Sequence, residues 1–265
     1  MSTWISILAF LTVIQTIVWR DSADTSIAPI LCDLSIRVQV GEIAAGPACA
    51  FIIARSLYLI IRHPTWDYED RRRHRRTLAL NLFLVIGLPI IINVQYYTVQ
   101  NSRFQVFEQL GCTFNWQSSG LAVIMLGLIP VVLSIASIMY LVSVAATLWK
   151  HKRNMSHLFV SHTSITPSLY IRILAFGLIL LIDSGIFIGN LFPPPTGFYP
   201  GWNVVHGNWS PEAIPAAEWQ TQSVGRLTVV WNGWINVWLA AIVFGLFVVS
   251  RSQTHVMSRC SIRVC

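Results

Sequence analysis

Five cysteines are the residues of this chain best suited to covalent chemistry. Cys32 and Cys112 lie between long apolar runs, where a bridge would join two connecting segments. Cys49 lies inside an apolar run and is expected to pack as a small apolar side chain. Cys260 and Cys265 stand near the C-terminus, where S-acylation is an option. The chemistry to expect from these thiols is therefore cross-linking or acylation.

Metal binding and catalysis require side chains at particular spacings, and this sequence does not contain them. None of its seven histidines forms an H-E-x-x-H pair or a histidine box. The G-x-S-x-G, Walker and dinucleotide-binding patterns are absent from the sequence too. We therefore predict no enzyme activity, no catalytic residues, no metal site and no cofactor.

The elements that position these residues are long apolar runs. Hydrophobic residues make up 54% of the 265 residues and charged residues only 11%, whereas soluble domains carry about 25% charged residues. Six runs approach the roughly 20 residues that a membrane-spanning helix needs, and they are too long for strands. For the first run a signal peptide is the alternative, although a basic start and an A-x-A cleavage site are missing. The predicted spans cover approximately 4–19, 38–61, 78–97, 121–149, 169–192 and 227–249.

This pattern predicts an all-α fold, a polytopic transmembrane helix bundle that forms one domain over residues 1–250. Residues 251–265 form a short tail. The formal charge of +7 occurs in short bursts between apolar runs rather than on one face, which excludes nucleic acid as a partner. The class of protein to expect is a multi-pass membrane protein.

Lysine and arginine predict its orientation, because they are enriched in cytoplasmic loops. Alternate connecting segments and the tail hold twelve of them, and the remaining segments hold only three. The C-terminus is therefore expected to be cytoplasmic, and six spans place the N-terminus inside as well. Cys32 and Cys112 then face the oxidising side, where disulfides persist. We predict a Cys32–Cys112 disulfide, with two unpaired thiols as the alternative.

Charged residues inside or beside the predicted spans are few. Asp33 and Arg37 are four positions apart, a spacing at which they can pair along one helix face. Glu42 and Asp183 lie deeper, where charges usually face the interior of a bundle. Two separated acids do not make an ion relay, so a small transporter is a less favoured alternative.

The outer segment at about 193–224 is long and aromatic. It contains Trp202, His206, Trp209 and Trp219 among several prolines. Such a segment could form a lid over a ligand site or rest on the lipid headgroups, and the sequence leaves both interpretations open.

Several short runs carry a resemblance to a known family. They are Leu31–Asp33, Ala54–Tyr58, Tyr97–Gln100, Arg103–Phe104, Phe107–Glu108, Gly111–Cys112, Pro130 with Tyr140, Tyr170 with Arg172, Trp202 with His206, and Pro215 with Trp219. Taken together, they resemble the fungal mating pheromone receptors of the a-factor-receptor type, which are class D G-protein-coupled receptors. The resemblance aligns the first apolar run with the second of that family's seven helices. It thus implies that the six spans correspond to helices two to seven and that this chain lacks the family's first helix.

The resemblance implies a receptor in the plasma membrane for a lipidated, farnesylated peptide pheromone, which signals to the α subunit of a heterotrimeric G protein. A truncated, non-signalling receptor remnant or modulator is the alternative. Membrane lipid is a further partner, and homo- or hetero-oligomers remain open. The implied ligand-side residues in the outer loops are Arg103, Phe104, Glu108, Trp202, His206 and Trp219. The implied G-protein-side residues are Arg55, Arg71, Arg72, Arg73, Lys150, Lys152, Arg153 and Arg172.

Overall fold

Within the residues that the structure describes, three helices are long and apolar enough to cross a membrane: Pro29–Leu59, His74–Tyr97 and Gly120–Thr147. They overlap the predicted spans 38–61, 78–97 and 121–149. The computed structural model describes residues 2–62, 71–150 and 197–221, together with short pieces of 172–186 and 230–245. The described part of the chain is mostly helical, which agrees with the predicted fold class.

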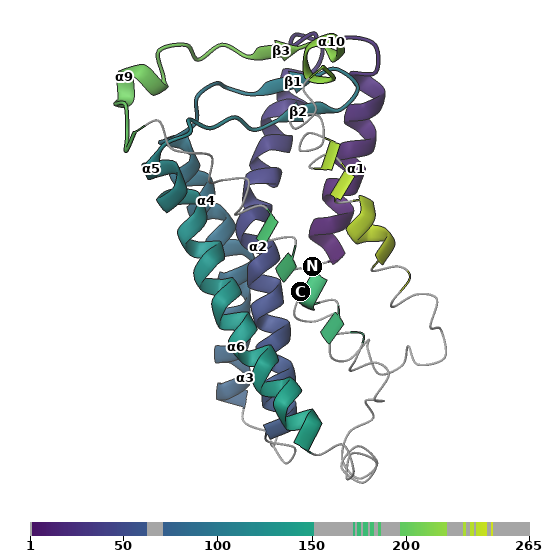
Figure 1. Cartoon of the computed structure of the whole chain (residues 1–265), viewed down its shortest axis with the longest axis vertical. Coiled ribbons are helices and arrows are strands. Elements are labelled where there is room, and N and C mark those ends of the chain that lie inside the picture. Colours follow the sequence, from purple (N-terminus) through teal and green to yellow (C-terminus); the bar gives the residue numbers. More distant parts are fainter. Residues whose placement is uncertain are drawn as a thin grey trace.

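The described elements follow one another along the chain as labelled in Figure 1. They are α1 (Ser2–Val18), α2 (Pro29–Arg62), α3 (Arg71–Leu82), η1 (Phe83–Gly87), α4 (Leu88–Tyr97), β1 (Gln105–Phe107), β2 (Gly111–Thr113), α5 (Gly120–Ala122), η2 (Val123–Gly127), α6 (Leu128–Lys150), α9 (Trp202–Val205), β3 (Glu212–Ile214) and α10 (Ala216–Trp219). Here η1 and η2 are single wide π-helical turns that join their neighbours into continuous helices.

The other three predicted spans have different outcomes. The first, 4–19, is helical, but its apolar helix Thr3–Val18 is shorter than the helices that qualify as candidate spans. The spans 169–192 and 227–249 and the tail 251–265 lie largely or wholly outside the described residues. The number of six spans therefore stays a prediction.

Helix α2 begins at Pro29, earlier than the predicted start of the second span at residue 38. Its apolar part covers 31 residues, which is about 46 Å at a rise of 1.5 Å per residue, whereas the hydrocarbon core of a bilayer is about 30 Å thick. Helix α2 is therefore longer than the apolar layer is thick, and its first turns carry the charged residues Asp33 and Arg37. Cys32, which we expected just outside the second span, lies inside α2 because this helix begins earlier than predicted. Hydropathy predicted the apolar part of the helix. The proline at the first helical position, Pro29, marks the observed start of α2.

Helix α2 is the central helix of the described bundle. It packs against α1, α4 and α6, and 67% of its apolar window is buried, compared with 28% for each of the other two candidate spans. A row of alanines and one cysteine on α2 is fully buried, namely Ala44, Ala45, Ala48, Cys49, Ala50 and Ala54. Small side chains let neighbouring helices approach closely, which is how helices associate where lipid removes most of the hydrophobic driving force.

Each of the two wide turns precedes a proline. Val85 in η1 lies four residues before Pro89, and Leu126 in η2 lies four residues before Pro130. In a regular helix, a proline ring would collide with the carbonyl of the residue four positions earlier and leave it without a backbone donor. A π-turn widens the helix at this point, so both helices remain continuous past their prolines.

Gly41 lies where α1, α2 and α4 meet. A Cβ atom at this position would lie 3.1 Å from the Trp4 ring, 3.4 Å from Pro89 and 3.5 Å from Asn93. We expect Gly41→Val to lower stability by about 1–3 kcal/mol through overpacking, measured as a lower thermal midpoint in detergent. Gly46→Val is the matched control, because a Cβ there meets nothing within 4 Å. Equal losses at the two glycines would contradict the expectation.

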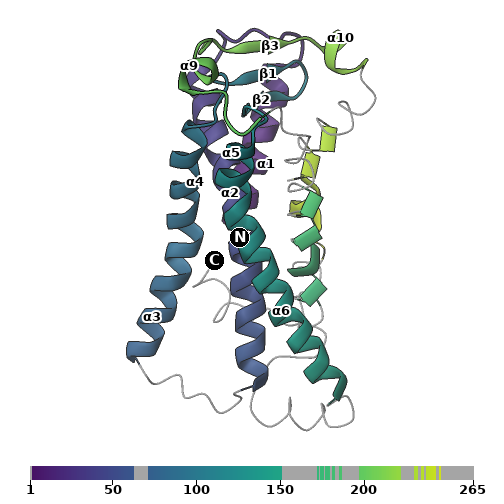
Figure 2. The ribbon, with the colours of Figure 1, turned by 60° about the vertical axis from the view of Figure 1, so that its left-hand side comes forward.

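The two ends of the helix bundle differ in structure. At one end lie the three strands, α9 and α10 (Figure 1, Figure 2). We call this set, with its connecting residues, the cap; it comprises residues 98–119 and 197–221. At the opposite end lie the beginning of α3 and the ends of α2 and α6, and we call this the basic end because Arg62, Arg71 and Lys150 are found there.

Candidate functional site

A small sheet joins the two segments of the cap. Its strand order is β2-β1-β3, with β1 antiparallel to β2 and parallel to β3. Val106 stands opposite Cys112 on one side and Ala213 on the other. The sheet therefore fastens the segment after α4 to a segment about a hundred residues later in the chain.

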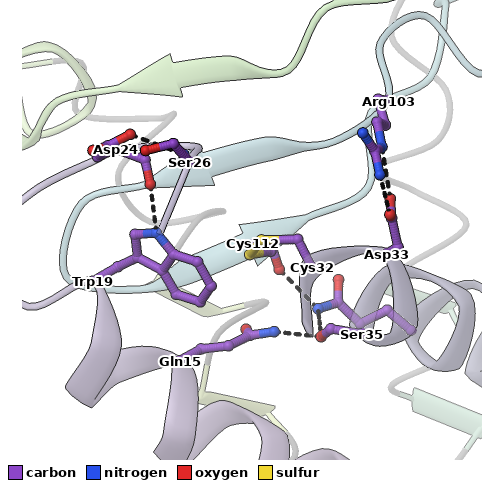
Figure 3. Close-up of a disulfide and its surroundings, with 10 residues drawn as sticks. Gln15, Trp19, Asp24, Ser26, Cys32, Asp33, Ser35, Arg103 and Cys112 are labelled. Carbon is purple, nitrogen blue, oxygen red and sulfur yellow. Dashed lines mark hydrogen bonds and ion pairs between the residues drawn. A yellow bond between two sulfur atoms is a disulfide. The ribbon is translucent and has the colours of Figure 1, made fainter. Parts of the chain in front are cut away.

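A disulfide fixes this sheet to the central helix. Cys32 in α2 and Cys112 in β2 are bonded, with their Cα atoms 5.3 Å apart (Figure 3). Both cysteines are buried in an apolar cluster that also contains Trp19, Ile36 and Phe104. The cross-link holds the β1–β2 hairpin on the first turns of α2.

Asp33, the residue next to this disulfide, holds the other strand of the hairpin. Arg103 precedes β1 and donates from Nε to Asp33 Oδ1 at 3.0 Å and from Nη2 to Asp33 Oδ2. This two-point hydrogen bond raises the pKa of the Arg103 guanidinium above its ordinary value, and such paired contacts are the stronger form of an ion pair. The predicted Asp33–Arg37 pair is wrong: the guanidinium of Arg37 lies instead over the ring of Tyr96, at 5.9 Å from its centroid.

Three polar side chains tie α1 into the same region. Gln15 donates to the hydroxyl of Ser35, and Gln39 donates to that hydroxyl at 3.1 Å and to the Cys112 carbonyl at 2.9 Å (Figure 3). These three residues are absent from the sequence-based predictions. A usable signal was present, because Ser35 and Gln39 share one helix face and Gln15 is an amide within an apolar run.

Glu108 organises the turn of the hairpin against α10. Its carboxylate accepts a hydrogen bond from the Ala216 backbone N–H at 2.6 Å, at the start of α10. Its carbonyl accepts from the indole N–H of Trp219 at 3.2 Å. A carboxylate at a helix start satisfies a backbone donor that the helix itself leaves unpaired. Glu108 and Trp219 are thus parts of the cap's internal framework.

An aromatic group lies at the cap end of α4. The Trp202 and His206 rings are stacked with centroids 3.9 Å apart, and His206 is stacked with Trp209 at 5.3 Å. The Tyr97 ring, on the last residue of α4, contacts all three of these rings at 5.5–5.8 Å. His206 Nε2 lies 3.0 Å from the Tyr97 carbonyl. These contacts attach α9 to the end of a candidate membrane span.

The six predicted ligand-side residues all lie in the cap, but they differ in accessibility. Phe104 is completely buried and Trp219 nearly so, so neither ring can touch a ligand unless the cap moves. Arg103 keeps 42% of its side-chain surface exposed, and Trp202 is 49% exposed. His206 is half-buried.

Most of the predicted G-protein-side residues in the described part of the chain lie toward the basic end. Arg55 is a half-buried residue in the second half of α2. Arg71, Arg72 and Arg73 form the first turn of α3, and Lys150 is the last residue of α6. Arg172 lies in one of the short described pieces, and Lys152 and Arg153 lie outside the described residues. In the part of the chain that the structure describes, no cluster of three or more His, Cys, Asp or Glu side chains could hold a metal ion.

The Arg103–Asp33 pair supports a prediction about the stability of the cap. Because the two side chains are 42% and 38% exposed, we expect Arg103→Gln and Asp33→Asn each to cost only about 0.5–1 kcal/mol. The double variant should cost no more than either single variant, because one interaction is removed in every case. Thermal midpoints of the four proteins in detergent measure this coupling. Additive losses would show that the two groups contribute separately.

These features define the class of protein: a helical membrane protein whose cap is pinned by a disulfide to its central helix and lies opposite a basic end. The chain belongs to the STE3 family, described as pheromone A receptor, which matches residues 1–260.

Named relatives agree with this family. The chain is 23% identical over 250 residues to the pheromone B alpha 2 receptor of Schizophyllum commune, covering 92% of this chain and 38% of the relative. It is 27% identical over 241 residues to the B alpha 3 receptor of the same species, covering 88% and 37%. It is 26% identical over 203 residues to pheromone receptor 1 of Ustilago hordei, covering 74% and 56%.

The chain thus spans less than two-fifths of the length of these Schizophyllum receptors. The relatives are named as receptors and not as enzymes. No solved structure matches the chain.

Proposed function

We propose that this chain senses a lipidated, farnesylated peptide mating pheromone at its cap and signals through its basic end to a heterotrimeric G protein. The observation that carries the proposal is its membership in the pheromone receptor family over nearly its whole length. In this proposal, the chain is a single domain over residues 1–250 with six spans in the plasma membrane, followed by a cytoplasmic tail at 251–265. Homo- and hetero-oligomers are both compatible with this arrangement.

The distribution of charge supports this orientation. Arg72, Arg75 and Arg76 are exposed at the start of α3, and basic residues are concentrated on the cytoplasmic side of membrane proteins. The same side chains would contact anionic lipid and acidic surfaces of a G-protein α subunit. The disulfide lies at the opposite end, which fits an oxidising exterior.

The cap supplies a candidate contact for the peptide part of a pheromone. Among the predicted ligand-side residues, Arg103 combines a full charge with an exposed surface. Because its partner Asp33 lies beside Cys32 on α2, a ligand group that competes for Arg103 would act directly on the junction between cap and helix. Binding can shift the helices only to the extent that the two arrangements differ in affinity for the ligand.

The test is expression of the full chain in a receptor-null mating strain with a G-protein-linked reporter, exposed to a panel of pheromone peptides. We expect a response to at least one lipidated peptide and a much weaker response to the same peptide without its lipid. Silence toward the whole panel, with surface expression confirmed, would overturn the proposal.

Two variants separate the ends of the molecule in this assay. Arg103→Gln should raise the pheromone concentration needed for half-maximal response, and Arg75→Gln with Arg76→Gln should lower the maximal response. Arg20→Gln is the control for loss of charge, because Arg20 is highly exposed in the α1–α2 connection, where it pairs with neighbouring Asp21. If all of these variants behaved like Arg20→Gln, the assignment of the two ends would be wrong.

A further inference from the structure

The segment that carries α9 is fastened to the cap ends of two candidate membrane spans. The backbone N–H groups of Gly120 and Leu121 donate to the carbonyls of Gly197 and Phe198 at 3.0 and 2.9 Å. On the other side, His206 lies within hydrogen-bond distance of the Tyr97 carbonyl. Because Gly120 begins one candidate span and Tyr97 ends another, these contacts hold the segment at the ends of two candidate membrane spans.

This segment exposes apolar side chains outward. Phe198 is 67% exposed. On α9, Trp202 is 49% and Val204 66% exposed, whereas Val205 is buried. We call Phe198, Trp202 and Val204 the aromatic anchor. Burial of such side chains is favourable, and tryptophan is enriched at membrane interfaces because it combines an apolar ring with one N–H donor.

The aromatic anchor continues an apolar stripe on α4. Ile90, Val94 and Tyr97 are exposed at helical spacing along this candidate span, and the ring of Tyr97 contacts that of Trp202. In Figure 1, α9 lies at the margin of the cap beyond α4 and α5, and in Figure 2 it lies above the end of α4. The exposed apolar surface of α4 thus leads, through the Tyr97–Trp202 contact, to α9.

Charge does not oppose insertion here. Residues 197–211 contain no Asp, Glu, Lys or Arg, and the first charged residue after them is Glu212 in β3. A charged side chain would strongly disfavour entry into the apolar layer. The composition of 197–211 is therefore that of a segment resting in the interface between lipid headgroups and acyl chains.

We propose that the aromatic anchor inserts into the lipid bilayer at its cap-side interface and that membrane lipid is the occupant of this surface. The anchor then holds one side of the cap on the membrane, while the Cys32–Cys112 disulfide holds the other side on α2. Trp202 thereby contacts lipid rather than a soluble ligand. The proposal is independent of the pheromone and of G-protein coupling.

A nitroxide label attached to Val204→Cys in the full chain, reconstituted in phosphatidylcholine vesicles, tests this proposal. Cys260 and Cys265 are changed to Ser, Cys49 is buried, and the protein without the new cysteine measures background labelling. Ala217→Cys is the matched control, because Ala217 is an exposed small residue on α10, the other short helix of the same cap segment. Phe198→Cys provides a second anchor position in case one label disturbs the fold.

Collisions with oxygen report exposure to lipid, and collisions with a water-soluble nickel complex report exposure to water. We expect the ratio of oxygen to nickel accessibility to be several-fold higher at 204 and 198 than at 217. Equal ratios at the anchor and control positions would overturn the proposal, because the anchor would then lie in water. Exclusion of both reagents from 204 and 198 would also overturn it, because protein would then cover the surface.

Discussion

Cys32→Ser and Cys112→Ser should each reduce the amount of folded receptor at the cell surface severely and to the same extent. The disulfide closes a loop with a sequence separation of 80 residues. Removing a native cross-link of this kind costs about 2–4 kcal/mol, largely because the unfolded chain regains conformational freedom. Since a typical domain is stable by only about 5–15 kcal/mol, this is a large share of the total.

The double variant sharpens this prediction. If both thiols act only through their bond, Cys32→Ser with Cys112→Ser should be no worse than either single change, in surface labelling and in thermal midpoint. Cys49→Ala is the control, because Cys49 lies in the same helix as Cys32 but outside this disulfide. Additive losses in the double variant would show that the thiols do not act as a pair.

Gly111→Ala should disrupt the hairpin nearly as strongly, although it removes no interaction. Gly111 has a φ of +96°, a backbone conformation that residues other than glycine rarely adopt. A Cβ atom at this position would lie 2.4 Å from Cβ of Gln15. That atom is fixed to the backbone of α1, so relief of the clash requires α1 or β2 to move. Backbone strain and overpacking together predict a loss of about 2–4 kcal/mol.

The comparison with Gly201 separates the two causes. Gly201 has a φ of +102°, but a Cβ at this position meets nothing within 4 Å, so Gly201→Ala should cost only the backbone strain, about 1–2 kcal/mol. Thermal midpoints and the fraction of protein with the Cys32–Cys112 bond, measured by thiol labelling after denaturation, check both variants. If the two substitutions cost the same, close packing of β2 against α1 would not be what requires glycine at residue 111.

The helices of the membrane region could be predicted because their cause is local. A run of apolar residues must satisfy its own backbone hydrogen bonds in lipid, and only a helix can do this within one segment. The runs 78–97 and 121–149 therefore coincide closely with observed helices. The start of α2 was placed too late because its first turns carry Asp33 and Arg37, which lower the hydropathy.

The cap could be predicted only in part. Cys32 and Cys112 were assigned to each other because the charge pattern put both on the same side of the membrane, and the structure brings them together. The parallel pairing of β1 with β3 had no detectable signal, because strands of three residues are too short to show an alternating pattern. Gln15, Ser35 and Gln39 were missed because their partners belong to different segments of the chain.

Asp33 shows the difference between what the sequence determines and what only the tertiary structure decides. The sequence alone determines that this protein is a set of apolar helices with basic residues on one side of the membrane and a cross-link on the other. Hydropathy and charge can be read from each segment independently of the others. The partner of Asp33 is Arg103 and not the nearby Arg37, because the hairpin delivers Arg103 to the start of α2 while Arg37 lies over Tyr96. Contacts of this kind arise only when distant segments fold together, so the tertiary structure alone decides them.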